Sequence, residues 1–214
     1  MGGEPQEEVT VLAPTLTGRA PFKSLLDKWL ARQTIPIVVL ADSRRGLAES
    51  LLGMLAETTT RYAAVACDDT WYSPDYLRAT LGALKFSGRR LIGYDPTVEY
   101  DMVHKTRRGV QHFGRSGLHT MLGETEALKV YFRRAVASLP MARDADIESR
   151  AWALARARSE GVTTIGNFAV TFKHKNPDPP AEGWNPDPGG AWLRQLLKED
   201  ADEYDKLAAR LEFK

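Results

Sequence analysis

The sequence predicts an α/β fold in which a mostly parallel central sheet carries helices on both faces, as a single domain plus a C-terminal helix. Three short apolar runs, at residues 9–14, 35–42 and 62–69, alternate with stretches of helical periodicity. This alternation is typical of parallel strands joined by crossover helices, and we expect both faces of the sheet to be buried. With 214 residues, 43% of them apolar, the chain can bury one sizeable core.

The stretches between the runs predict amphipathic helices, because their apolar residues recur at helical spacing. In the first stretch these are Phe22, Leu25, Leu26, Trp29 and Leu30, and in the second Leu47, Leu51, Leu52 and Leu55. A third helix is expected to run through Leu77 and Leu84. Its start is predicted by Ser73 as the cap, Pro74 in the first turn and an acidic Asp75, which the helix dipole favours.

The second half of the chain predicts one or two strands over residues 90–106, then helices over 122–136 and 147–159. A strand should follow over 162–174, an irregular loop over 176–190, which is rich in Pro, Gly, Asn and Asp, and an amphipathic helix over 192–211. We therefore divide the chain into a flexible N-terminus (1–8), a core (9–176), and a Pro/Gly loop with the C-terminal helix (177–214).

Composition excludes several classes of protein. The formal net charge is +1, so the whole chain has no electrostatic bias toward nucleic acid or membrane. Cys67 is the single cysteine, which excludes an internal disulfide and a cysteine-rich metal site. The acidic N-terminal stretch does not resemble a signal peptide, and no run approaches the roughly 20 apolar residues that span a bilayer. We expect a cytoplasmic protein with no membrane partner.

The strongest local motif is CDDTWYSPDYL at residues 67–77. Asp68 and Asp69 fall at the carboxyl end of a predicted buried strand, where open α/β sheets bind their ligands. Adjacent carboxylates repel each other and lose hydration on burial, a cost that a divalent cation would offset. The alternative is that the two aspartates only cap turns.

This motif resembles the inverting family-2 glycosyltransferases of the GT-A fold. Those enzymes have a strand that ends in an acidic cluster, followed by an aromatic residue and a Pro-Asp-Tyr-Leu sequence. The matching residues here are Asp68-Asp69, then Trp71, then the sequence from Pro74 to Leu77, while Ala66 replaces the family's first aspartate. The family's first two strands match as well, with Pro14 and Thr15 after one and Asp42 at the end of the other.

The resemblance implies a metal-dependent transfer of sugar from a nucleotide-diphospho-sugar, in particular a UDP-sugar, to an acceptor hydroxyl with inversion. It implies donor contacts by Pro14, Thr15, Asp42, Asp68 and Asp69. It also implies a Mn²⁺ or Mg²⁺ ion held by Asp68 and by His174, although a lone histidine is more commonly an ordinary surface or core residue.

An inverting transfer needs a general base for the acceptor hydroxyl. The acidic stretch DADIESR at residues 144–150 is similar to the family's acidic pair at the start of a helix. Asp146 is the first choice, with Glu148 and Asp144 as alternatives. These acids could instead serve only the first turn of a helix, where the dipole favours them.

A basic segment, residues 104–115, lies within a stretch from Met102 to Gly123 that has no acidic residue. It suits a phosphate-bearing acceptor, and a modified base in DNA is one specific hypothesis. The alternative is a solvated surface. Two rival functions also remain: a degenerate GT-A domain that binds a nucleotide sugar or nucleic acid, suggested by Ala66, and a sugar nucleotidyltransferase, whose Gly-rich loop is missing.

Overall fold

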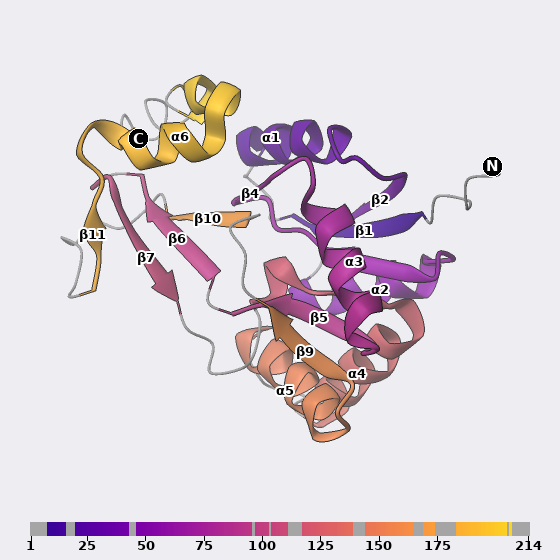
Figure 1. Ribbon diagram of the computed structural model, residues 1–214. Helices are drawn as coiled ribbons and strands as arrows, with labels where there is room; N and C mark the ends of the chain where they lie inside the picture. The colour runs from indigo at the N-terminus through magenta and orange to yellow at the C-terminus, as the bar shows by residue number, and fades with distance from the viewer. Residues whose placement is uncertain are drawn as a thin grey trace.

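Two sheets form the framework of the protein in the computed structural model (Figure 1). The structure describes residues 8–15, 20–42, 46–95, 97–102, 104–110, 117–138, 144–164, 169–173, 183–204 and 206. The larger sheet has six strands in the order β2-β1-β3-β8-β5-β9, and the smaller has five in the order β11-β7-β6-β10-β4. The predicted α/β class is confirmed.

The larger sheet begins with the three predicted strands. They are β1 (Val9–Pro14), β2 (Ile37–Asp42) and β3 (Tyr62–Val65), and β1 pairs in parallel with both of the others. The sheet continues through β8 (Leu122–Glu124), β5 (Leu91–Tyr94) and β9 (Gly161–Thr164). β9 is parallel to β5, but β8 is antiparallel to both β3 and β5.

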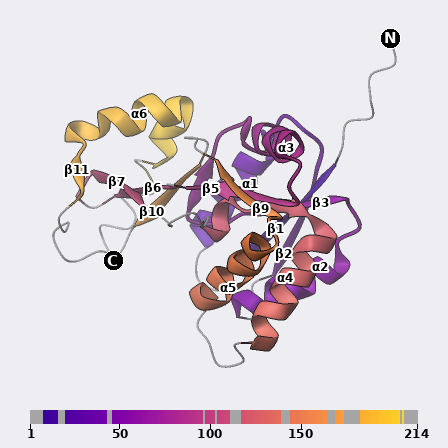
Figure 2. The ribbon, with the colours of Figure 1, turned by 60° about the horizontal axis from the view of Figure 1, so that its bottom comes forward.

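Alternation along β1 and β3 splits their side chains between two cores, because successive residues of a strand point to opposite faces. Val9 and Val11 pack toward the core that includes Leu26 of α1 (Ala20–Ala31) and residues of α3 (Tyr76–Ser87). Leu12 packs toward a second core with α2 (Leu47–Glu57), α4 (Thr125–Ser138) and α5 (Asp144–Ala157). Figure 2 shows α2, α4 and α5 together on one side of the sheet. The prediction of helices on both faces is confirmed.

The prediction that both faces of the sheet are buried was wrong at β2. Val38 is 38% exposed and Val39 41% exposed, because β2 is the outermost strand and pairs only with β1. The inner strand β3 is fully buried along its length.

The smaller sheet was not predicted as a separate unit. Three segments leave the larger sheet and enter it: β3 leads to β4 (Thr70–Tyr72), β5 to β6 (Thr97–Asp101), and β9 to β10 (Ala169–Lys173). β7 (Thr106–Val110) and β11 (Asn185–Pro186) complete it. Among the described strand pairs of this sheet, β6–β10 is the parallel one. The mostly parallel arrangement is therefore correct for the larger sheet alone.

The structure corrects the prediction that a helix begins at residue 122. Residues 122–124 form a strand, and the helix α4 starts only at Thr125. Gly123 permits this close pairing, since a Cβ there would lie 2.7 Å from the carbonyl oxygen of Arg90. A strand of three residues has too little periodicity to be recognised in a sequence.

The start of α3 also differs from the prediction. Asp75 is the N-cap and makes no side-chain cap hydrogen bond, and Ser73 does not cap the helix through its side chain. Instead the side-chain Oε1 of Gln33 accepts a hydrogen bond from the backbone N–H of Leu77 at 3.1 Å. The first turn is thus satisfied by a residue from the loop after α1.

The C-terminal segment is broken where one helix was expected. α6 (Ala191–Leu197) follows a short 3₁₀ turn at Pro188–Gly190, and a second turn at Lys198–Asp200 precedes a helical stretch at 201–204. Lys198 has a φ of 53°, which interrupts the helix. Among the helices of the described ranges, none is long and apolar enough to cross a membrane.

Candidate functional site

The carboxyl ends of β1 and β2 bring three predicted residues together. Pro14 pairs with Asp42 in the register of the two strands, and the backbone N–H of Thr15 donates to the carbonyl oxygen of Asp42 at 3.0 Å. Thr15 is buried and Asp42 is half-buried. Pro14, Thr15 and Asp42 therefore form one edge of a candidate site.

The aspartate pair lies at the same edge of the sheet, in the turn that joins the two sheets. The backbone N–H of Ala66 donates to the carbonyl oxygen of Leu12 at 2.9 Å, which continues the β1–β3 pairing. The chain then turns, with the N–H of Thr70 donating to the carbonyl of Cys67 at 3.2 Å. Asp68 is 3% exposed and Asp69 is half-buried. Both predicted aspartates thus occur where strands of the two sheets meet.

A buried tyrosine holds the backbone of this turn. The hydroxyl of Tyr72 accepts a hydrogen bond from the N–H of Cys67 at 2.9 Å and donates one to the carbonyl of His119 at 2.9 Å. Burial raises the pKa of Tyr72 well above its ordinary value, and the nearby Cys67 adds to the effect. Its neutral hydroxyl therefore remains able to donate, which fixes the position of the turn.

Asp69 faces the C-terminal segment. Its carbonyl oxygen accepts a hydrogen bond from the N–H of Phe172 at 2.8 Å, and the ring of Phe172 packs on that of Tyr204, with centroids 3.8 Å apart. The pKa of Tyr204 is raised well above its ordinary value, chiefly by burial and then by the charges of Asp69 and Asp200. The C-terminal segment is therefore part of the surroundings of the aspartate pair.

The candidate bases lie in the first turns of α5. This helix leads into β9, which runs in the same direction as β3. A helix that packs back along such a strand starts at the carboxyl edge of the sheet, the edge that also has Asp68. Asp146 is half-buried there. Asp144 and Glu148 belong to the same helix, but their side chains lie outside the described part.

His174, the predicted second metal ligand, lies outside the described residues. In the ranges that are described, no group of three or more His, Cys, Asp or Glu side chains could hold a metal ion. The aspartates of the turn do have the chemistry of hard oxygen ligands, which suits Mn²⁺ or Mg²⁺.

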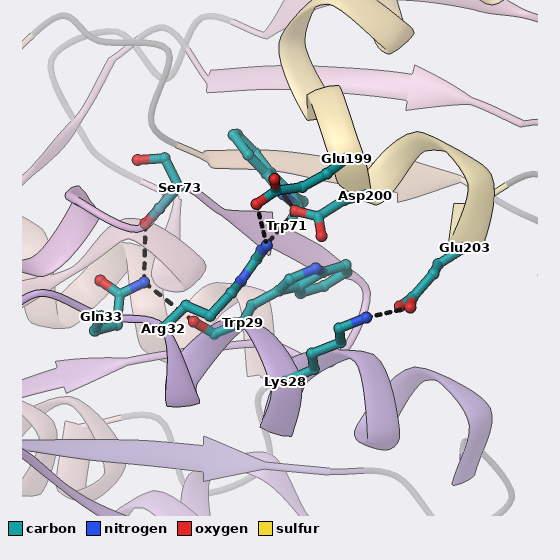
Figure 3. A network of polar contacts seen from close by, with 9 residues as sticks. All are labelled: Lys28, Trp29, Arg32, Gln33, Trp71, Ser73, Glu199, Asp200 and Glu203. Carbon is teal, nitrogen blue, oxygen red and sulfur yellow. Dashed lines mark hydrogen bonds and ion pairs between the residues drawn. The ribbon is translucent and has the colours of Figure 1, made fainter.

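A contact network that the sequence analysis missed secures the C-terminal segment (Figure 3). The carboxylate of Asp200, 4% exposed, accepts hydrogen bonds from Nε1 of Trp71 at 3.0 Å and from Nη2 of Arg32 at 2.5 Å. Beside it, Lys28 pairs with Glu203. The sequence did contain one indication that this segment packs on the core, namely apolar residues at helical spacing. These residues are Leu193, Leu197, Ala201 and Tyr204.

Most of the described basic segment makes internal contacts. Arg108 donates to the carboxylate of Glu99 at 2.8 and 2.9 Å, and its guanidinium lies over the ring of Trp184 at 4.6 Å. Arg107 lies over Trp192 at 4.7 Å. His104 hydrogen-bonds Asp101 at 3.1 Å, and residues 111–116 lie outside the described ranges. These arginines pack against Trp184 and against Trp192 of α6, in addition to any ligand they bind.

The arrangement of the two sheets and their helices is the GT-A fold, which this chain shares with solved glycosyltransferase structures. Among the solved structures similar to this chain is S. aureus TarS 1-349, with a TM-score of 0.54 and 13% identity over 77% of this chain and 60% of that one. Its complex with UDP-GlcNAc matches with a TM-score of 0.54 and 13% identity, over 95% of this chain and 71% of that one.

A mannosyltransferase, PcManGT from Pyrobaculum calidifontis in complex with GDP-Man and Mn²⁺, is similar with a TM-score of 0.50 and 12% identity. The match covers 96% of this chain and 65% of that one. This chain thus spans less than two thirds of the length of both the first TarS structure and the mannosyltransferase. No protein-family model and no curated protein sequence matches the chain.

Proposed function

We propose that this protein is a glycosyltransferase that moves a sugar from a nucleotide-diphospho-sugar to an acceptor hydroxyl with inversion. One observation carries the proposal: on a GT-A sheet, the ends of β1, β2 and β3 bring Thr15, Asp42 and Asp68 to one edge. Ligands of open α/β sheets bind outside the carboxyl ends of the strands. Residues 9–176 would form the catalytic core, with 177–214 as an attached segment.

Binding of the donor would use both parts of this edge. Pro14, Thr15 and the half-buried Asp42 would face the nucleoside, and Asp68 and Asp69 would face the diphosphate. Solved neighbours hold UDP-GlcNAc and GDP-Man, and a UDP-sugar is the donor we propose. A cytoplasmic location, suggested by the single cysteine, remains a prediction.

The residues of the turn fit a divalent cation. Asp68 is a buried carboxylate next to a second carboxylate, and a cation would offset the repulsion and lost hydration of the pair. Asp68 and His174 would hold it. When bound, such a cation supplies Lewis-acid assistance to the departing diphosphate. Ala66 removes one carboxylate that the family has, so the chain must hold the ion with fewer acidic ligands.

The transfer itself requires one proton acceptor. The acceptor oxygen bonds to the anomeric carbon from the face opposite the diphosphate, the bond between that carbon and the diphosphate oxygen breaks, and the hydroxyl proton passes to a carboxylate. Asp146 is the proposed base, with Glu148 and Asp144 as alternatives on the same helix. The nucleoside diphosphate leaves with the bonding electrons, so charge and atoms balance.

A degenerate GT-A domain that binds without turnover is the second candidate function, and Ala66 favours it. Nucleic acid with a modified base is one acceptor hypothesis for the active enzyme, motivated by the basic segment at 104–115. A sugar nucleotidyltransferase has less support, since the Gly-rich loop of that class is missing after β1.

Thermal unfolding with a panel of nucleotide sugars, with and without Mn²⁺, tests the proposal. A donor at about a hundred times its dissociation constant should add roughly 2.7 kcal/mol of stability. A Mn²⁺-dependent shift with one donor, followed by release of its nucleoside diphosphate with an acceptor, supports the transferase. If a donor stabilises the protein but no acceptor tested leads to release of the nucleoside diphosphate, the binding module is favoured. If no donor stabilises the protein, both the transferase and the binding module are contradicted.

A further inference from the structure

A small cleft separate from the aspartate turn lies between the β6–β7 hairpin and α6. Its lining includes Lys105 from the hairpin, Arg194 from α6, and the two glycines before α6, Gly189 and Gly190. The cleft has a volume of about 30 Å³, room for roughly two water molecules and hence for one small chemical group.

The charged side chains that line the cleft are both cations. Among the described residues, its lining contains two cations, Lys105 and Arg194, and no carboxylate, although the chain as a whole has a net charge of only +1. Both side chains are exposed. A cleft lined by charge of one sign concentrates the field and attracts counter-ions. Arginine and lysine together are the side chains that bind phosphate oxygens most effectively.

The acids behind the wall of the cleft are already bound by donors. The carboxylate of Asp187 accepts from the hydroxyl of Tyr100 at 3.1 Å and from the backbone N–H groups of Trp192 and Leu193 at 2.8 and 3.2 Å. Asp101 accepts from the backbone N–H of His104 at 3.0 Å. These hydrogen bonds leave less of the acidic charge to oppose an anion in the cleft.

Three residues that line the cleft have positive φ values. Lys105 has a φ of 51°, which is uncommon for a non-glycine residue, and the N–H of Asp187 donates to its carbonyl at 2.8 Å. Gly189 and Gly190 have φ values of 68° and 70°, which glycine adopts without strain. Lys105 is therefore the strained residue of this group, and strained residues are enriched at ligand sites.

Tyr204 connects the cleft to the aspartate turn. It lines the cleft, and its ring packs on Phe172, whose backbone N–H binds the carbonyl of Asp69. The donor, by contrast, is expected at the ends of β1 and β2, in the other sheet. The cleft therefore lies on the side of the aspartate turn that faces the smaller sheet.

We infer that this cleft binds a phosphate group of the acceptor, with Lys105 and Arg194 as the contacting cations. The assignment to the acceptor rests on the proposed glycosyltransferase, whereas the binding of phosphate does not. Lys105 is the cation of the described basic segment that lines the cleft, where Arg194 of α6 is the second cation. Arg107 and Arg108 lie over tryptophans instead, and Arg108 is paired with Glu99.

Amide NMR of the ¹⁵N-labelled full chain tests this inference. Sodium phosphate should shift the backbone signals of Lys105, Gly189 and Gly190 in a saturable manner, while sodium chloride at equal ionic strength should not. Lys105→Gln and Arg194→Gln should each weaken phosphate binding about tenfold, the effect of one lost charge-assisted hydrogen bond. Lys206→Gln, an exposed lysine of the same segment that does not line the cleft, is the matched control.

Further ligands separate the sources of the phosphate. Dimethyl phosphate binding as well as inorganic phosphate supports a phosphodiester chain as acceptor, and binding of inorganic phosphate alone supports a terminal phosphate. If UDP shifts Gly189 and Gly190 most strongly, the cleft belongs to the donor and the inference is overturned. Equal shifts with chloride, or phosphate shifts that survive both substitutions, also overturn it. Phosphate binding in a protein that transfers no sugar would contradict only the proposed function.

Discussion

The carboxylate of Asp200 accepts a hydrogen bond from the indole of Trp71 at 3.0 Å, across 129 positions of sequence. Trp71 follows the aspartate turn by two residues, and Asp200 lies in the C-terminal segment. This single bond therefore joins the candidate site to the last part of the chain. Tyr204, four residues after Asp200, packs on Phe172 and stacks on Trp29 with ring centroids 5.8 Å apart.

Replacing Asp200 with Ala should destabilise the protein by about 2 kcal/mol, because it leaves the indole N–H of Trp71 without its acceptor and removes a mostly buried partner of Arg32. Urea unfolding monitored by tryptophan fluorescence measures the change. Glu199→Ala is the control: Glu199 is 82% exposed and also pairs with Arg32, so its loss should cost less than about 1 kcal/mol. Equal effects of the two substitutions would contradict the role given to Asp200.

Two glycines should respond to alanine in opposite directions. Gly123→Ala places a Cβ 2.7 Å from the carbonyl of Arg90, and the strain should cost about 1–3 kcal/mol. Gly82 lies within α3 with nothing within 4 Å of the added Cβ. Gly82→Ala should therefore raise the free energy of unfolding by about 0.5–1 kcal/mol, because alanine has the higher helix propensity. Thermal unfolding of both variants measures these changes in stability. A Gly123→Ala variant as stable as the natural protein would argue against the close pairing of β8 with β5.

Asp68→Asn should abolish the Mn²⁺-dependent part of the donor's thermal stabilisation, because the neutral amide removes the charge that the cation needs. Without ligand, the variant should be about as stable as the natural protein, or more so, since the repulsion between adjacent carboxylates is relieved. Asp75→Asn is the matched control, since Asp75 lies beyond β4 and pairs with Arg78. Retention of the Mn²⁺-dependent shift in Asp68→Asn would place the metal elsewhere.

Asp146→Asn should lower turnover by roughly 10²–10⁴-fold, the contribution of a positioned general base, and leave donor binding unchanged. Glu148→Gln and Asp144→Asn, made in parallel, identify the base if one of them shows the larger loss. Initial rates of nucleoside diphosphate release measure turnover, and thermal shift measures donor affinity. If all three variants turn over normally, the base is not on this helix.

The local sequence was sufficient for the parts of the fold that have strong periodicity. The short apolar runs of β1 and β3 predicted parallel strands, because strands buried on both faces are apolar nearly throughout. The spacing from Phe22 to Leu30 predicted a covering helix, because helical side-chain periodicity follows from backbone geometry. The end of β3 likewise predicted where Asp68 and Asp69 lie. Short elements were not predicted, because they contain too few residues to show a period. β8, for example, has three residues.

The sequence by itself determined the class of fold, the edge of the sheet with its aspartate pair, and the likeness to GT-A transferases, because these depend on neighbouring residues. Only the tertiary structure decided which distant residues complete the site. Gln33 caps α3, Asp200 binds Trp71, and Lys105 and Arg194 both line one cleft. Each of these arrangements depends on how separate elements pack, and a hydrogen bond across 44 or 129 positions leaves no periodic pattern in the sequence.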